Sequence, residues 1–548
     1  MMHSLTVAVS ALRRAFANPD IRRAELGWMT GWAAEWAWLV ALFVFAFEAG
    51  GIAAVGLVGL ARTLPAALLA PAISSLTDRL PRHRVLLGVH SGRAVLIGLA
   101  ALSVAADLSP LVVYVIAPLD ALLAVLHRPT HMALMPSLAR SPEELVAANV
   151  ASSTLEAIGI LAGPVIGGLL VATDQAALTF AAPAVAFAVA AGIVIGIRPG
   201  QQIRRVAERV GTLSMLLGGV RALAAYPHAA LLLSLFGAQT LVRGILSVLL
   251  VVASVELLGL GTEGVGYLNA AIGAGGLMGA LTAVVLVGRA RLAPPFFLGL
   301  VLWGGPILLV GLVPLAGVAL LSLALVGAGN AVLDIAGFSL IQRSVPNAVR
   351  GRVFGMLEAI VMLTVGVGAA LAPPLVALLG VQGALIATGL MLPVLALVSW
   401  PRVSATDAHA IIPARELALL SGVPMLRMLP LTVLEQVASD LTAMRFRDGA
   451  EVIRQGEVGD RFYIVAEGAA EVSVDGRLVR RMLAGDSYGE IALLRDVPRT
   501  ASVTASGDLV AYTLERDAFL AAVTGDRQSL HAAEAVIGER WGSDAAGI

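Results

Sequence analysis

The sequence contains no cysteine, no lysine and few charged residues. Without cysteine, the 548-residue chain has no disulfide framework, no thiolate metal ligand and no cysteine nucleophile. Without lysine, it has no phosphate-binding loop of the Gly-x-x-x-x-Gly-Lys-Ser/Thr type, which argues against ATP-driven chemistry. Charged residues make up 14% of the chain and hydrophobic residues 58%, whereas soluble proteins have about 25% charged residues. This composition excludes a single soluble domain and a disordered chain, and it predicts a surface that faces lipid.

The charge is unevenly distributed along the chain. Residues 1–400 carry a net charge of +6 and residues 401–548 a net charge of −6, and the change coincides with a drop in hydropathy near Trp400. We therefore expect a membrane part followed by an acidic soluble domain of ordinary size. The predicted membrane part consists of a cytoplasmic amphipathic segment (1–24), a first six-span half (25–197), a cytoplasmic middle loop (198–227) and a second six-span half (228–400). A linker (401–412) and a C-terminal domain (413–548) follow.

Twelve stretches of the membrane part are apolar over the ~20 residues that a span requires. Arginines occur in alternate loops, and the intervening loops contain acidic residues but no arginine. By the positive-inside rule, this pattern predicts a multi-pass protein of the cell (inner) membrane with both termini and the C-terminal domain in the cytoplasm. An internal repeat supports two equivalent halves, because Leu155-Glu156-Ala157-Ile158 recurs 202 residues later as Leu357-Glu358-Ala359-Ile360.

The loop after the second span reads Asp78-Arg79-Leu80-Pro81-Arg82-His83-Arg84. It resembles the cytoplasmic Asp-Arg-x-Gly-Arg-Arg motif of the major facilitator superfamily, but two glycines of the family are replaced here, by Ser74 and Pro81. Two six-span halves joined by a basic middle loop resemble the same family. The resemblance implies an α-helical membrane fold of twelve spans that works by alternating access. It also implies that Asp78, Arg79 and Arg82 form a conformational latch, although ordinary positive-inside loop charge would give the same pattern.

The fifth span contains a glycine-rich motif, Gly159-x-x-x-Gly163-Pro164-x-x-Gly167-Gly168. Glycines let a neighbouring helix approach closely, and a proline bends the helix. The motif resembles the antiporter motif of the family, which implies packing that seals a proton leak path; a generic glycine-rich interface is the alternative. The stretch 135–152 also resembles the branch of multidrug, macrolide and siderophore exporters.

Charged side chains inside membrane spans are costly and usually functional. Glu35 shares one helix face with Trp32 and Trp36, because they lie at positions i, i+3 and i+4. A carboxylate beside aromatic rings suits a cationic or aromatic substrate, or a proton carrier. The residues predicted to couple protons to substrate are Glu35, Asp120, Arg62 and Arg93.

Two alternatives accompany this prediction. Glu35 is also expected to form a purely structural ion pair if it meets Arg62 or Arg93. Glu156 and Glu358 occupy equivalent positions in the repeat, so a structural role near the axis that relates the two halves fits them equally well.

The C-terminal part changes in pattern. An amphipathic helical stretch at 417–441 precedes short alternating runs that are separated by glycines, and a second helical stretch follows at 517–541. Short alternating runs bounded by turn residues are typical of antiparallel strands. We therefore predict an α+β domain in which helices flank an antiparallel β-barrel.

The segment Tyr488-Gly-Glu-Ile-Ala-Leu-Leu-Arg-Asp-Val-Pro-Arg-Thr-Ala501 closely resembles the phosphate-binding cassette of cyclic nucleotide-binding domains. Glycine permits a close backbone approach, helix N–H groups attract an anion, and arginine forms a two-pronged contact with phosphate. A glutamate disfavours phosphate and therefore suits the ribose 2′-hydroxyl group. The predicted binding residues are Gly489, Glu490, Ile491, Ala492, Arg499, Thr500 and Ala501.

These patterns predict a transporter and not an enzyme: a proton-coupled exporter that is regulated by cAMP or cGMP and needs no metal. Thr500 does not decide between the two nucleotides. The alternatives are a non-transporting receptor or scaffold that senses cyclic nucleotide, and a lipid or solute uptake transporter with a structural C-terminal domain. Expected partners are a small-molecule substrate, protons, membrane lipids and the nucleotide. Nucleic acid is not expected, because the tail is acidic and lacks a helix-turn-helix after the barrel. The substrate and the choice between monomer and dimer stay open.

Overall fold

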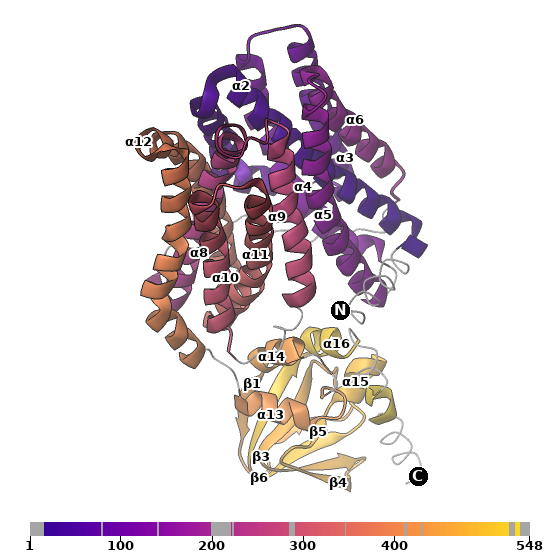
Figure 1. Ribbon diagram of the computed structural model, residues 1–548. Helices are drawn as coiled ribbons and strands as arrows, with labels where there is room; N and C mark the ends of the chain where they lie inside the picture. Colours follow the sequence, from indigo (N-terminus) through magenta and orange to yellow (C-terminus); the bar gives the residue numbers. More distant parts are fainter. Residues whose placement is uncertain are drawn as a thin grey trace. The chain divides into compact units, whose positions relative to one another are not determined.

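The computed structural model divides the chain into two compact units, Met1–Ala410 and Ile411–Ile548. The first unit is helical, and the second combines short helices with a sheet (Figure 1). The structure describes residues 16–77, 80–139, 142–198, 221, 224–283, 291–345, 347–409, 414–427, 429, 431–524 and 532–536.

The first unit consists of two successive groups of helices. The first group comprises α2 (Pro19–Thr77), α3 (Arg82–Ala105), α4 (Leu111–Leu138), α5 (Pro142–Val171) and α6 (Ala176–Ile195). The second group comprises α8 (Pro227–Val252), the short π-helix η1 (Ala253–Leu257), α9 (Gly264–Ala283), α10 (Ala293–Leu312), α11 (Ala316–Ser344) and α12 (Asn347–His409). The predicted middle loop at 198–227 lies largely outside the described residues.

Within the described residues, nine helices are long and apolar enough to cross a membrane. Two of them are interrupted by a glycine in the left-handed backbone conformation, α2 at Gly51 (φ 63°) and α12 at Gly380 (φ 68°). Glycine adopts this conformation without the steric penalty that a Cβ atom causes. Both interruptions coincide with loops expected between consecutive spans, and the total of twelve spans stays a prediction.

The last helix of the first unit extends beyond the drop in hydropathy near Trp400. Residues 401–409, expected as part of a linker, continue α12 as a helix, with Pro401 inside it. A helix is held by backbone hydrogen bonds and does not need apolar side chains. The backbone can therefore stay helical beyond Trp400, where the hydropathy drops. The unit boundary follows at Ala410.

The glycine motif of α5 forms close helix contacts. Gly159, Gly163 and Gly167 pack against the backbone or Cβ atoms of α2 residues 29–40, and Gly168 packs against Gly266 of α9. A Cβ atom on Gly163 would lie only 2.5 Å from the carbonyl oxygen of Ala33. Pro164 lies inside α5. The close packing is therefore confirmed, whereas its role as a proton seal stays a prediction.

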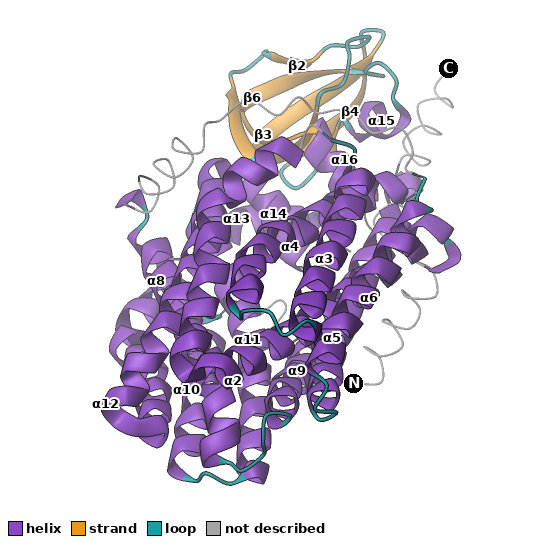
Figure 2. Ribbon diagram, turned by 90° about the horizontal axis from the view of Figure 1, so that it is seen from above, coloured by secondary structure: helices purple, strands orange, loops and turns teal. Residues whose placement is uncertain are grey.

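The second unit contains a single antiparallel sheet among its described residues, drawn in orange in Figure 2. Four strands lie side by side in the order β1-β6-β3-β4. The short strand β2 pairs with β6, and the short strand β5 pairs with β3. The strands are β1 (Thr442–Phe446), β2 (Glu451–Ile453), β3 (Arg461–Val474), β4 (Arg477–Leu483), β5 (Ser487–Tyr488) and β6 (Ser502–Glu515).

Helices cover one end of this sheet and supply much of its core. They are α13 (Ala414–Gly422), α14 (Leu431–Asp440), α15 (Glu490–Arg495) and α16 (Arg516–Thr524). The Phe462 ring from β3 stacks on the Phe519 ring from α16, with 4.5 Å between the ring centroids. The predicted helical stretch at 417–441 is two helices, because Gly422 and Pro424 interrupt it. The predicted stretch at 517–541 is helical to Thr524 and again at 532–536.

The α5–α2 contact gives a stability prediction. Gly163→Ala should lower the thermal unfolding midpoint of the purified chain, because an overpacked helix interface costs about 1–3 kcal/mol. Gly192→Ala on α6 is the matched control, since no atom lies within 4 Å of the added Cβ and alanine favours the helix. Equal midpoints for the two variants would show that the α5–α2 contact is looser than described.

Candidate functional site

A cavity of about 600 Å³ lies within the helical unit. Side chains of α2, α4 and α12 line it, so both groups of helices contribute. Most of the wall is apolar, with alanines, Val125, Pro129 and Met362, and Trp32 adds an aromatic ring. The charged side chains on the wall are Glu35, Arg62, Arg128 and Glu358. Such a volume suits a small organic molecule.

A chain of ion pairs connects this wall with the interior. Glu35 accepts from Arg62 at 3.1 Å and from Arg93 at 3.0 Å, and Arg93 also binds Asp120 at 2.7 Å. The side chains of Arg93 and Asp120 are 0% exposed. The structure thus brings together all four residues that were predicted to couple protons to substrate, and it also contains the ion pairs of the structural alternative. The coupling role itself stays a prediction.

The sequence analysis missed a group of buried histidines beside this cavity. His127 lines the cavity, and its ring lies 5.0 Å from that of His90 and 4.6 Å from that of Trp28, between centroids. His131 stacks on Trp28 at 4.2 Å and contacts the Ser152 hydroxyl at 3.3 Å. The one available signal was the four-residue spacing of His127 and His131, which places both on one face of α4.

The predicted latch is described only in part. Asp78 and Arg79 lie outside the described residues. Arg82, at the start of α3, donates a hydrogen bond to the carbonyl oxygen of Ala133 in α4 at 2.5 Å. This contact joins two helices of the first group, and the latch stays a prediction.

A second cavity, of about 460 Å³, lies in the sheet unit. All seven residues predicted to bind a cyclic nucleotide line it, from Gly489–Ala492 at the start of α15 and from Arg499–Ala501 before β6. The sequence analysis missed the strand residues that complete the wall: Ile453, Val472, Val479, Arg480, Met482, Tyr488 and Val503. Alternating side chains of a strand point to one face, but the pattern alone does not tell which face closes over a ligand.

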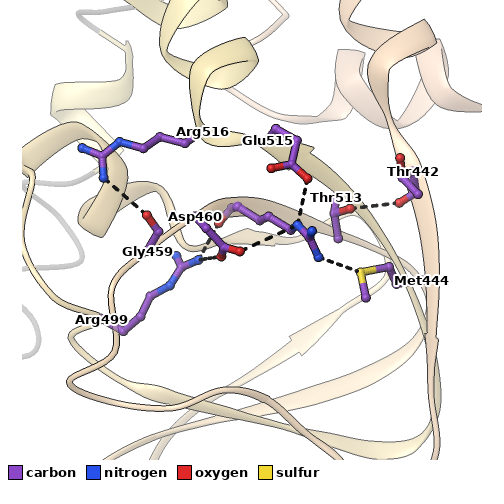
Figure 3. A network of polar contacts seen from close by, with 9 residues as sticks. Thr442, Met444, Gly459, Asp460, Arg499, Thr513, Glu515 and Arg516 are labelled. Carbon is purple, nitrogen blue, oxygen red and sulfur yellow. Dashed lines mark hydrogen bonds and ion pairs between the residues drawn. The ribbon is translucent and has the colours of Figure 1, made fainter. Parts of the chain in front are cut away.

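Two backbone carbonyls fix the Arg499 guanidinium at this cavity. Arg499 donates to the carbonyl oxygen of Gly489 at 3.0 Å and to that of Arg461 at 2.7 Å. Its guanidinium also lies 3.6 Å from the carboxylate of Asp460 (Figure 3). Gly489 has φ 94°, and a Cβ atom there would lie 2.7 Å from the guanidinium. Glycine is therefore required both by the turn and by the position of Arg499.

The cavity favours an anion with an adjacent hydroxyl group. Burial lowers the pKa of the Arg499 guanidinium, an effect that Tyr463, Asp460 and Glu490 oppose. Its charge is incompletely compensated by neutral carbonyls and an exposed aspartate, so an anionic ligand would stabilise it. Glu490 is 1% exposed and lines the same cavity, where a carboxylate accepts a hydrogen bond from a hydroxyl group.

The ion-pair chain of the helical unit gives a second stability prediction. Arg93→Met should destabilise the protein by about 3–5 kcal/mol, because it leaves Asp120 and part of Glu35 as uncompensated buried charges. Arg62→Met should cost nearer ~1 kcal/mol, since Glu35 keeps Arg93 and the Arg62 side chain is partly exposed. Folded yield and thermal midpoint of the two variants measure the difference. Equal losses of stability in the two variants would contradict the conclusion that Arg93 is the main cation of the ion-pair chain.

Comparison with known proteins finds a separate family for each of the two parts of the chain. The family model of the Major Facilitator Superfamily matches residues 26–357, and that of the cyclic nucleotide-binding domain matches residues 443–526. A cAMP-dependent protein kinase regulatory subunit of Mucor circinelloides f. lusitanicus is 40% identical over 104 residues, which are 18% of this chain and 24% of that protein. The cGMP-dependent protein kinase egl-4 of Caenorhabditis elegans is 47% identical over 76 residues, which are 14% of this chain and 10% of that protein. The chain thus spans a quarter or less of the length of these two relatives.

A solved structure resembles the helical unit. The crystal structure of the nucleoside transporter NupG superimposes with a TM-score of 0.60 over 70% of this chain and 99% of that chain. At 12% sequence identity, the likeness concerns the fold alone. The superfamily model covers more than half of the chain, and the sheet unit has its own family match. The chain is therefore a multi-pass member of the Major Facilitator Superfamily that carries a cyclic nucleotide-binding domain in its C-terminal part.

Proposed function

We propose that this protein is a proton-coupled exporter of small molecules in the cell (inner) membrane, regulated by a cyclic nucleotide on its cytoplasmic side. It acts as a transporter and not as an enzyme. The observation that carries the proposal is the position of Glu35, in the wall of a cavity between the two helix groups and bound by two guanidinium groups. Both termini lie in the cytoplasm in this proposal, in agreement with the distribution of arginines.

The ion pairs suggest how a proton drives the cycle. A proton and the Arg62 guanidinium compete for the Glu35 carboxylate, because protonation removes the charge that holds the pair. Glu35 and Arg62 lie on the two segments of α2, on either side of the interruption at Gly51. Protonation of Glu35 therefore loosens the contact between these segments, and deprotonation restores it. Alternating access requires such a contact, one that differs between two states.

The close packing of α5 against α2 supports a coupled exchange of protons for substrate rather than a passive leak of protons. The three glycines that face α2 leave no space for side chains in the contact. A dry, close helix contact contains no water path for a proton, so protons do not leak along this contact. In this proposal, outward transport of substrate accompanies inward transport of protons through the titrating side chains of the cavity.

The regulatory ligand in this proposal is cAMP or cGMP. Arg499 and the first backbone N–H groups of α15 bind the cyclic phosphate, and Glu490 accepts from the ribose 2′-hydroxyl group. The relatives of the domain include kinases named for dependence on cAMP and on cGMP, so neither nucleotide is preferred.

The chain itself connects the transport cavity with the nucleotide-binding domain. The first segment of α12 contributes Gly355, Glu358 and Met362 to the transport cavity, and its second segment, after the interruption at Gly380, continues to His409. The first helix of the sheet unit, α13, begins at Ala414. A ligand that binds one state of the transporter more tightly than the other shifts the equilibrium by its difference in binding free energy.

The proton coupling is tested with Glu35→Gln. Glutamine keeps the shape of the side chain but does not titrate, so substrate-induced proton movement should fall to background. The assay uses the full chain in liposomes that contain a pH-sensitive dye, with a panel of neutral, anionic and cationic small molecules. Glu48→Gln, an exposed carboxylate outside the cavity, is the control. Proton movement that persists in Glu35→Gln would place the proton carrier elsewhere.

The nucleotide site is tested with Arg499→Ala in the full chain. Loss of a charge-assisted contact costs about 1.5–3 kcal/mol, so affinity for cAMP and cGMP should fall roughly tenfold to a hundredfold. Arg495→Ala on the exposed side of α15 is the matched control, since it does not line the cavity. Calorimetry gives the affinities, and the same liposomes show whether nucleotide changes the transport rate. Absence of nucleotide binding by the unaltered chain would remove the regulatory part of the proposal.

A further inference from the structure

The charges around the transport cavity do not balance. Among the described residues, five carboxylates and four guanidinium groups line the cavity or interact with a lining charge, either directly or through one further charged side chain. They are Glu35, Asp120, Glu156, Asp334 and Glu358, and Arg62, Arg93, Arg128 and Arg243. With histidine counted as neutral, one negative charge is left over.

The excess charge is that of Glu358. Ion pairs account for Glu35 and Asp120 through Arg62 and Arg93, and for Glu156 through Arg128 at 3.2 Å. Arg243 interacts electrostatically with Asp334. No described cation forms an ion pair with Glu358, and the carboxylate of Asp334 contributes a further negative charge in its surroundings. The Glu358 side chain is exposed on the cavity wall.

The internal repeat shows which partner is absent. Glu156 and Glu358 are equivalent, 202 residues apart, and Glu156 is neutralised by Arg128. The residue 202 positions after Arg128 is Asn330, which is neutral and donates its amide to Asp334 at 2.8 Å. The second half therefore keeps the carboxylate of the pair but not the cation.

The rest of the wall is suited to an apolar body. Trp32, Met362, Gly355 and several alanines surround the charged side chains. An aromatic face attracts a cation, and methionine adapts to ligands of different shape. In a wall of low polarity, a single carboxylate gains most from a partner that brings one positive charge and needs few hydrogen bonds.

We infer that the transport cavity binds an amphipathic organic cation of single charge, with its charge opposite Glu358 and its apolar body against Trp32 and Met362. The inference rests on the proposed function, because that proposal makes this cavity the substrate site. It assigns to Glu358 substrate recognition, which is separate from the proton coupling assigned to Glu35.

Two ions of matched size and opposite charge test the inference. The purified full chain in detergent is titrated with tetraphenylphosphonium and, separately, with tetraphenylborate. The unaltered chain should prefer the phosphonium, and Glu358→Gln should weaken phosphonium binding roughly tenfold, as expected for loss of one partly screened charge pair. Glu358→Asp keeps the charge and should retain most of the affinity, while Glu48→Gln should bind as the unaltered chain does.

Several results would overturn the inference. These are equal phosphonium affinity in Glu358→Gln and the unaltered chain, borate binding as tight as phosphonium binding, or no binding of either ion by the unaltered chain. Thermal midpoints of all variants identify a folding defect. The affinity of Glu358→Asp then shows whether weaker phosphonium binding in Glu358→Gln comes from the lost charge or from the altered fold. Because binding in detergent needs no gradient, cation binding without transport would contradict the proposed function alone. Transport of an uncharged molecule without cation binding would contradict this inference alone.

Discussion

The organisation of the transport cavity depends on one buried guanidinium. Arg93 of α3 binds Asp120 of α4 and Glu35 of α2, so a single side chain connects three helices and has no exposed surface. Removing a guanidinium from water is costly unless several acceptors surround it, and here two carboxylates do so. Glu35 in turn holds Arg62, which places a charge pair on the cavity wall.

The two halves share an architecture but not this chemistry. The positions 202 residues after the four members of the ion-pair chain are Gly237, Gly264, Pro295 and Ser322, none of which is charged. The second half contributes instead a polar group around Asn330, which accepts from the Trp303 indole at 3.1 Å and donates to Asp334. In the proposal, the proton carrier Glu35 therefore lies in the first half, and the carboxylate that recognises the substrate, Glu358, lies in the second.

The sequence predicted local features well and long-range partners poorly. The seven predicted residues of the nucleotide cavity come from one continuous segment, Gly489–Ala501, whereas the strand residues of the wall lie outside this segment and were missed. The interruption of α2 was predictable because consecutive glycines, Gly50 and Gly51, separate two apolar stretches. The ion pair of Glu35 with Arg93 was predicted only as an alternative to a pair with Arg62. The sequence does not give the rotation of each helix about its axis, and this rotation determines which side chains come into contact. The histidine group around Trp28 was missed because its members come from three helices, α2, α3 and α4.

One strand of the nucleotide domain has a consequence for how the protein behaves at high concentration. Among the described strands, β4 pairs only with β3, so its other edge offers unpaired backbone groups together with the exposed Leu478 and Leu483. Open apolar edges of this kind recruit strands from other molecules. The same strand carries Arg477, Arg480 and Arg481, and two such edges repel each other when they approach. In a chain without lysine, arginine thus protects a sheet edge against aggregation, and this protection should weaken as salt screens the charges.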